Sequence, residues 1–182
     1  MDFHELINQR QSVRKYSDKP VERDKIETII EAVHVAPSAC NSQPWKIIII
    51  DEPGLKNEVA KATFSKTIAF NKFAVEAPII AVLVIEKAKL IAQIGGSLKN
   101  QEYPQYDIGI AAAHFCLQAA ELGLGTCMIG WFDEKRIQDL LRIPKSRKIG
   151  LVITLGYAPE AYKLRKKIRK PLDEICGFNS YL

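Results

Sequence analysis

Apolar residues early in the chain first follow the spacing of one buried helix face and later, after a polar segment, form a short unbroken run. The positions with helical spacing are Ile26, Ile29, Ile30 and Val33. Because Pro37 disfavours helical backbone at the residue before it, this pattern predicts a helix over residues 22–35. The unbroken apolar run of residues 47–50 predicts a fully buried strand.

The first residues carry the signals of a short helix. Asp2 and Glu5 have the spacing of a capping box, which predicts a helix that begins after Asp2. Phe3, Leu6 and Ile7 are expected on its inner face. An irregular basic segment follows this helix.

The middle of the chain predicts a central strand, a loop and a long apolar helix. Residues 78–86 are apolar on both faces, so this strand is expected in the centre of a sheet that is covered on both sides. Residues 87–106 have the glycine, proline and polar content of a loop. Asp107 is expected to cap a helix to about residue 122, which is apolar almost all round and therefore typical of a core or a subunit interface.

The other predicted elements complete a single domain. They are a helix over residues 53–62, a short strand within residues 123–132, a helix over residues 134–141 capped by Asp133, and a strand over residues 148–157. Together they predict one α+β domain over residues 1–182, with a sheet of four or five strands and helices around it. Residues 159–182 carry apolar residues but no core of their own, so this arm is expected to lie on the body or on a partner.

Composition and charge narrow the classes of protein. Of the 182 residues, 47% are hydrophobic and 26% are charged, as in ordinary soluble globular proteins. The longest apolar stretch, residues 77–85, is far shorter than the ~20 residues of a membrane span, and the N-terminus has no apolar signal core. A cytoplasmic protein without membrane contact is therefore expected. The net charge of +5 is matched by the five basic residues of one run, residues 165–170, and since the rest is neutral, nucleic-acid binding is disfavoured.

The spacing of reactive residues predicts no metal and no catalytic side chain. The four cysteines lie far apart without a C-x-x-C pair, and the three histidines fall in three separate segments. The sequence contains no G-x-S-x-G, H-E-x-x-H or P-loop motif, and no G-x-G-x-x-G after a strand. An enzyme with this sequence is therefore expected to take its chemistry from a cofactor.

Four segments carry groups that suit such a cofactor. RQSVRKY, which begins at Arg10, offers two arginines and a hydroxyl to a phosphate and its polyol. APSACNSQPW, from Ala36, offers amides and hydroxyls to the edge of a heterocycle. CMIGW, from Cys127, ends a strand at a glycine, where a backbone N–H can approach a flat ring closely. KKIRKP, from Lys166, offers a second set of cations.

In their order, these motifs resemble those of the nitroreductase family of FMN-dependent oxidoreductases, over essentially the whole chain. The resemblance rests on R-x-S-x-R-x-Y, A-P-S-x-x-N-x-Q-P-W, D-x-G-x-A and G-L-G-T-C-x-x-G, and on a closing L-G-Y followed by a basic run and Pro-Leu. It implies the nitroreductase-like FMN-binding fold, with a central, mainly antiparallel sheet of four to five strands flanked by helices. Residues 159–182 are then an arm that embraces the partner subunit.

The resemblance also implies which residues bind FMN. They are Arg10, Gln11, Ser12, Arg14, Pro37, Ser38, Ala39, Asn41, Gln43, Ile129, Gly130, Lys167 and Arg169. Arg10 and Ser12 are expected at the phosphate or the ribityl chain, and Arg14 at the pyrimidine side of the flavin. Gln11 stands where the family often has an arginine, so one phosphate contact is expected to be weaker.

The implied site is built by two subunits. Pro37, Ser38, Ala39 and Asn41 are expected to reach the flavin of the neighbouring subunit, and Gln43 to fix this turn or to contact the ring. A backbone N–H at Ile129 and Gly130 is expected to face flavin N5. The expected phosphate contacts of the basic run are Lys167 and Arg169, with Arg165 or Lys170 as alternatives.

The implied activity is hydride transfer from NADH or NADPH through FMN to an electron-poor acceptor, such as a nitroaromatic or a quinone. It runs in ping-pong order in a homodimer with shared active sites. Stacking and proximity carry the rate, so no general acid or base is assigned. Two alternatives stay open: a different flavin reaction on the same fold, such as dehalogenation or azoline oxidation, and a flavin-binding protein without catalysis.

Overall fold

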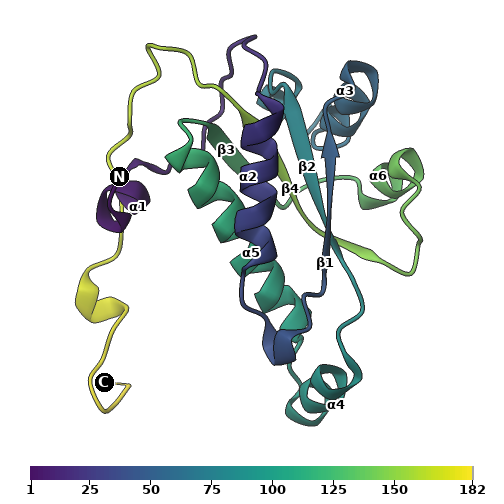
Figure 1. Cartoon of the computed structure of the whole chain (residues 1–182), viewed down its shortest axis with the longest axis vertical. Coiled ribbons are helices and arrows are strands. Elements are labelled where there is room, and N and C mark those ends of the chain that lie inside the picture. Colours follow the sequence, from purple (N-terminus) through teal and green to yellow (C-terminus); the bar gives the residue numbers. More distant parts are fainter. Residues whose placement is uncertain (182) are drawn as a thin grey trace.

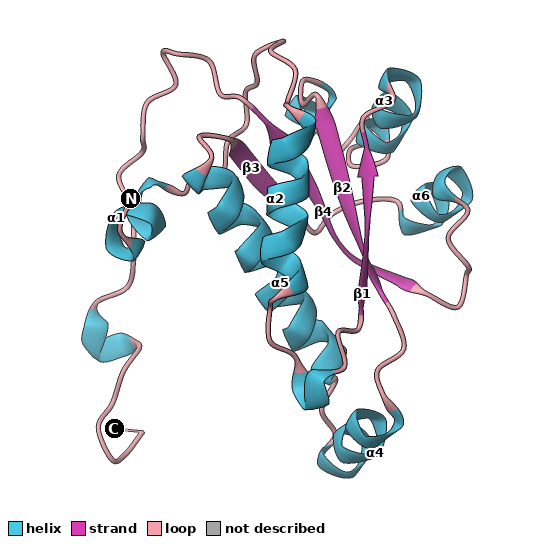
Figure 2. Cartoon of the chain, viewed as in Figure 1, coloured by secondary structure: helices cyan, strands magenta, loops and turns pink. Residues whose placement is uncertain are grey.

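The computed structural model describes residues 1–181, and its centre is a four-stranded sheet (Figures 1 and 2). From one edge to the other the strands are β1 (Trp45–Ile50), β2 (Ile79–Ile85), β4 (Lys148–Gly156) and β3 (Gly125–Ile129). All three neighbouring pairs are antiparallel. The predicted α+β class and the predicted antiparallel sheet are therefore confirmed.

Helices cover both faces of the sheet (Figure 2). One face packs against α2 (Arg23–His34) and α5 (Tyr103–Glu121), and the other packs against α3 (Pro53–Lys61) and α6 (Glu134–Leu141). Strand β2 lies between the two layers, and its successive side chains point to opposite faces. Ile79, Ala81 and Leu83 belong to the core with α2 and α5, and Ile80, Val82 and Val84 belong to the core with α3 and α6. Both sets are buried, which explains why this strand is apolar throughout.

Three helices form as their patterns predict. In α2 the predicted apolar face buries Ile26, Ile29 and Val33. Helices α3 and α6 lie close to their predicted bounds. The predicted cap of α6 also forms, because Arg136 N donates to Asp133 Oδ1 at 3.0 Å.

Strand β1 was predicted to be fully buried, and this prediction is wrong. β1 forms one edge of the sheet, next to β2. Ile50 is buried, whereas Ile47, Ile48 and Ile49 are only half-buried. An edge strand has a single neighbour in the sheet, so its apolar side chains are covered less completely than those of a central strand.

The segment before Asp107 was predicted to be a loop, and most of it is helical instead. Helix α4 covers Leu90–Lys99, and α5 already begins at Tyr103. A Cβ at Gly96 would lie 2.6 Å from Gln101 O, and Gln101 N donates to Gly96 O at 2.8 Å, so this glycine allows the tight turn that ends α4. Asp107 consequently lies inside α5, and the prediction that it caps the helix is wrong.

Helix α1 (Phe3–Gln9) forms with its predicted capping box. Glu5 N donates to Asp2 Oδ1 at 2.8 Å, and Asp2 N donates to Glu5 Oε2 at 3.2 Å. The predicted inner face is wrong for a single chain, since Phe3 is 68% exposed and no residue of α1 is buried. Apolar side chains left open in this way are typical of an interaction surface.

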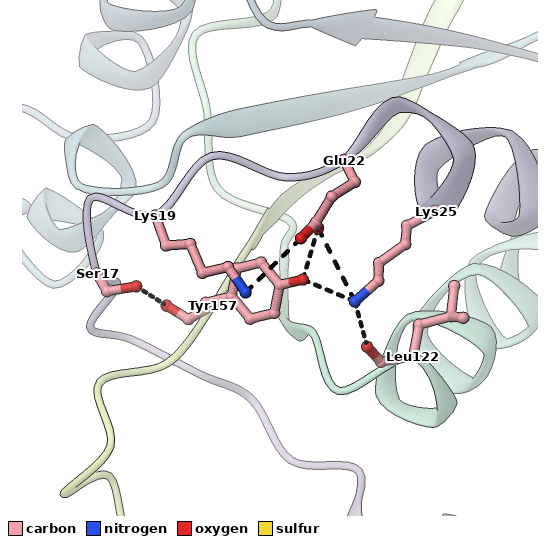
Figure 3. A network of polar contacts seen from close by, with 6 residues as sticks. All are labelled: Ser17, Lys19, Glu22, Lys25, Leu122 and Tyr157. Atoms are coloured by element: carbon pink, nitrogen blue, oxygen red, sulfur yellow. Dashed lines mark hydrogen bonds and ion pairs between the residues drawn. The ribbon is translucent and has the colours of Figure 1, made fainter.

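A network of polar contacts around Tyr157 holds the end of β4 (Figure 3). The Tyr157 hydroxyl donates to Glu22 Oε2 at 2.6 Å and accepts from Lys25 Nζ at 2.7 Å. Lys25 also donates to Leu122 O at 3.3 Å, and Lys19 Nζ lies 4.0 Å from the centre of the Tyr157 ring. The start of α2 and the end of α5 are thereby tied to the point at which the chain leaves the sheet.

Residues 159–181 leave the sheet as an extended arm that runs past α1 (Figure 1). The arm contains one short 3-10 turn, η3 (Leu172–Glu174). Leu172, Ile175 and Phe178 are 78%, 65% and 87% exposed, so the described part of the arm has no core of its own, as predicted. Within residues 1–181, no helix combines the length and the apolar character that crossing a membrane requires.

Candidate functional site

The basic segment after α1 lies along the free edge of β3. Ser12 forms a parallel bridge with Thr126, and Val13 N donates to Thr126 O at 2.8 Å. This close approach needs Gly125, because a Cβ there would lie 2.6 Å from a methyl carbon of Val13. The segment that begins at Arg10 therefore extends the edge of the sheet.

The arm closes over this segment. Arg165 N and Arg165 Nε donate to Gln11 Oε1 at 3.2 and 3.3 Å, although the two residues are 154 positions apart in the sequence. Arg165 also donates to Ser12 O, and Lys167 Nζ donates to Arg10 O at 2.5 Å. Residues 10–14 are thus brought together with Arg165 and Lys167, and this group is called the cation cluster below.

Among the described residues, the cations of the cation cluster have no acidic ion-pair partner. These cations are Arg10, Arg14, Arg165 and Lys167. The pKa of Lys167 is lowered, first by burial and then by the charge of Arg10. Cations gathered against their own repulsion suit a phosphate, which accepts charge-assisted hydrogen bonds from several of them.

The basic run was predicted to act through Lys167 and Arg169, and the structure distributes its contacts more widely. Lys167 reaches the cluster, whereas Arg169 Nη1 donates to Ile168 O at 2.7 Å. The charge of Arg169 is still close enough to lower the pKa of Lys167. Arg165, the predicted alternative, donates to Gln11 Oε1 and to Ser12 O, so both Arg165 and Lys167 of the basic run contact the segment that begins at Arg10.

The predicted ring position lies at the other end of β3. Ile129 is the buried last residue of the strand, and Gly130 follows it in an exposed position. A Cβ at Gly130 would meet no heavy atom within 4 Å, so packing inside the chain does not require this glycine. Ile129 is three residues from Thr126, which corresponds to about 10 Å along a strand. An anionic group at the cluster and a flat ring at Gly130 therefore fit a single extended ligand.

Two residues that sequence reasoning did not select help to shape these positions. Tyr162 Oη accepts from Arg14 N at 3.0 Å. Asn71 is buried, and its Nδ2 donates to Thr63 O at 3.0 Å and to Trp131 O at 3.3 Å, which fixes the chain directly after β3. Neither residue stands in a motif, and both act through backbone atoms that only the fold brings near.

Residues 37–43, called the lip below, lie near the start of helix α5, whereas the cation cluster lies near its end. Ala39 N donates to Asp107 Oδ1 at 3.0 Å near the start of α5, whereas Arg10 and Ala120 line one small hollow near its end. Thirteen residues separate these two positions of α5, which corresponds to about 20 Å of helix. One chain therefore does not bring the two halves of the predicted site together.

The lip is shaped by its own side chains. Gln43 N donates to Ser38 Oγ at 2.8 Å, and Gln43 Nε2 donates to Asn41 Oδ1 at 2.7 Å. Cys40, Asn41 and Gln43 have φ angles of 52°, 49° and 49°, in the left-handed region that non-glycine residues rarely adopt. These hydrogen bonds thus hold a turn whose backbone is strained.

Other candidate places in the molecule hold none of the predicted site residues. A hollow of about 530 Å³ lies between α4 and the ends of β2 and β4. Its wall includes the ion pair of Glu86 and Arg147, with 2.6 Å between Oε2 and Nε. Among residues 1–181, no group of three or more His, Cys, Asp or Glu side chains is placed to hold a metal ion.

The fold and this site define an α+β protein with a cation cluster at the edge of its sheet and a separate polar turn, the lip, near the start of α5. The sequence model of the Nitroreductase family matches residues 7–157. Because this match spans most of the chain, the chain belongs to the Nitroreductase family, and the predicted resemblance is confirmed.

Individual relatives agree with this assignment. The NADH dehydrogenase of Thermus thermophilus is 25% identical, over 96% of this chain and 95% of its own length. Iodotyrosine deiodinase 1 of Sus scrofa is 25% identical, over 96% of this chain and 67% of its own length. The FMN-dependent nitroreductase of Clostridium difficile R20291 superposes with a TM-score of 0.75 and 26% identity, over 97% of this chain and 98% of that one. The chain is therefore an oxidoreductase of this family.

Proposed function

We propose that the chain is an FMN-dependent oxidoreductase that passes hydride from NADH or NADPH to an electron-poor acceptor, such as a nitroaromatic or a quinone, in ping-pong order. The observation that carries this proposal is the cation cluster beside β3, about 10 Å along the strand from Ile129, the residue before the exposed Gly130. FMN would supply the redox chemistry, because its ring system accepts and returns hydride. The FMN-dependent structural relative supports the same cofactor.

The chain's own residues bind and orient in this proposal, and no side chain is assigned as a general acid or base. The proposed contacts to the phosphate and the ribityl chain are Arg10, Gln11, Ser12, Lys167 and Arg169. Arg14 faces the pyrimidine side, and the backbone at Ile129 and Gly130 approaches flavin N5. Arg165 keeps the arm closed over the segment through its hydrogen bonds to Gln11 and Ser12.

A homodimer with shared active sites completes the proposal. Pro37, Ser38, Ala39, Asn41 and Gln43 of each lip would serve the FMN that the partner subunit mainly holds. The open apolar side chains of α1 and of the arm support an interface. In this assembly residues 1–182 form one nitroreductase-like domain, residues 159–182 embrace the partner, and the enzyme is cytoplasmic.

Reductive dehalogenation is the second reaction to test. It is favoured by the similarity to iodotyrosine deiodinase 1, which spans 96% of this chain at 25% identity. The proposed site can serve either reaction, since hydride from the nicotinamide reaches the same ring in both cases.

Flavin binding and its reduction test the proposal directly. The purified protein should be yellow with FMN, and NADH or NADPH should bleach it without oxygen. A nitroaromatic, a quinone and a halogenated phenol, added separately in a stopped-flow mixer, should restore the colour at different rates and so rank the acceptors. Lys167→Met should weaken FMN binding, whereas the exposed neighbour Lys166→Met should not. A protein that takes up no FMN would refute the proposal, and a yellow protein that neither nicotinamide reduces would leave only a binding role.

A further inference from the structure

The internal hydrogen bonds of the lip decide which atoms it presents to a ligand. An asparagine amide has one acceptor oxygen and two donor hydrogens. With the opposite orientation of the amide, Asn41 would present its oxygen to a ligand. In this chain Gln43 Nε2 donates to Asn41 Oδ1 at 2.7 Å. The acceptor end of the Asn41 amide is thus turned toward Gln43, and the Nδ2 hydrogens are left for another molecule.

The same residue also sets the role of the neighbouring hydroxyl. Gln43 N donates to Ser38 Oγ at 2.8 Å, so the Ser38 hydroxyl hydrogen is free to donate elsewhere. Ala39 N is already committed to Asp107 Oδ1. The lip therefore offers donors from Ser38 and Asn41, and its matching side-chain acceptors are used inside the turn.

The backbone conformation of Gln43 does not require a glutamine side chain. Gln43 has a φ of 49°, and asparagine tolerates this left-handed region better than glutamine does. Asparagine would keep the backbone N–H that binds Ser38, but its side chain is one methylene shorter. The extra length of Gln43 is used for the bond to Asn41, not for the turn.

We propose that Gln43 is a positioning residue, which locks the Asn41 amide with its donors outward and makes the lip a donor surface for the carbonyl oxygens of the flavin ring. The proposal rests on the proposed function, and it concerns the flavin held mainly by the partner subunit. A preset amide does not have to be ordered when the ligand binds, so it strengthens binding. Donors at the carbonyl edge also favour the more electron-rich state of the ring, and so raise its midpoint potential.

The test compares variants of Gln43 that keep the backbone N–H bond to Ser38 but lose the side-chain bond to Asn41. In Gln43→Asn the apo protein should unfold at the same temperature as the wild type or at a higher one. Its dissociation constant for FMN should nevertheless rise about threefold to tenfold, the loss of one net hydrogen bond. The midpoint potential of the bound FMN should become more negative. Gln43→Met, which also keeps the backbone N–H, should show the same loss of affinity.

A double-mutant cycle tests whether Gln43 acts through Asn41. Asn41→Ala alone should lose at least as much FMN affinity as Gln43→Asn. In the Asn41→Ala background, Gln43→Asn should cause no further loss. The matched control is Gln105→Asn, because the Gln105 amide also donates to a nearby side chain, that of Glu102, but lies outside the lip. This control should leave the FMN affinity unchanged.

Three results would overturn the proposal. In the first, Gln43→Asn binds FMN as tightly as the wild type and at an unchanged midpoint potential. In the second, the losses of affinity from Gln43→Asn and Asn41→Ala add in the double variant. In the third, the apo Gln43→Asn protein loses thermal stability. A wild-type protein that takes up no FMN gives a different result, since it refutes the proposed function itself.

Discussion

At the scale of single residues, the two glycines of the β3 region have different reasons to be glycine. A Cβ at Gly125 would lie 2.6 Å from Val13, whereas one at Gly130 would meet no heavy atom within 4 Å. Gly125→Ala should therefore lower the free energy of unfolding by about 1–3 kcal/mol. Gly130→Val should change it by less than about 0.5 kcal/mol but weaken FMN binding. Denaturant unfolding and FMN titration of both variants check this, and full FMN affinity in Gly130→Val would contradict the proposed ring position.

Lys167 predicts a dependence of stability on pH. Its pKa in the folded protein is lowered, first by burial and then by the charge of Arg10, from the usual 10.5. Between the lowered pKa and 10.5 the unfolded chain binds more protons, so the stability of the apo protein should rise with pH in that window. Denaturant unfolding of the wild type and of Lys167→Met across this window measures the difference. A difference that does not change with pH would show that Lys167 carries no lowered pKa.

At the scale of elements, the Tyr157 network joins β4 to the start of α2 and predicts an acid-sensitive contribution. The pKa of Glu22 is lowered, first by the hydrogen bond from Tyr157. A carboxylate with a lowered pKa contributes stability above its usual 4.5, and this contribution is lost as the pH falls through the lowered value. Tyr157→Phe should therefore lower the unfolding temperature at neutral pH, with little difference from the wild type in strong acid.

The control for this measurement is Tyr181→Phe, because Tyr181 is fully exposed in the arm. Its unfolding temperature should match that of the wild type at every pH. An effect of Tyr157→Phe that is equally large in acid would mean that Glu22 is not the partner whose charge matters.

At the scale of the whole molecule, the proposed homodimer assigns separate tasks to the two parts of the arm. Removal of residues 171–182 keeps Arg165 and Lys167 but deletes the exposed apolar side chains beyond them. The truncated protein should be shifted toward monomer in light scattering and should bind FMN more weakly, because each monomer holds only half of a site. A truncated protein that remains a dimer with full FMN affinity would contradict the role of the arm.

Mixed dimers test whether two chains share each site. One chain carries Lys167→Met in the cation cluster, and the other carries Asn41→Ala in the lip. In a mixed dimer one site then has both defects and the other has none, so random mixing should restore about a quarter of the sites. FMN affinity is measured before and after the two variants are unfolded and refolded together. If mixing restores no tight binding, the cluster and the lip do not belong to one shared site.

Some residue patterns of this chain fit more than one local structure, and only the fold distinguishes between them. Apolar periodicity was enough for α2 and β2, because both bury the faces that their own patterns define. Glycine content misled at α4, since Gly96 lies inside the helix and permits the tight turn at Gln101 that ends it. The apolar run of β1 did not reveal an edge strand, because the burial of a strand depends on which strands lie beside it, and the local sequence does not determine these neighbours.

The sequence by itself determined the family, the class of fold and the residues that carry the candidate site, because local motifs and apolar periods record short-range requirements. Only the tertiary structure decided which of these residues meet. It placed Arg165 on Gln11 across 154 positions, and it put the lip near the start of α5 and Arg10 near the end. It also set the direction of the Asn41 amide through Gln43. Such contacts depend on how distant segments pack, and the spacing of residues along a chain does not contain that information.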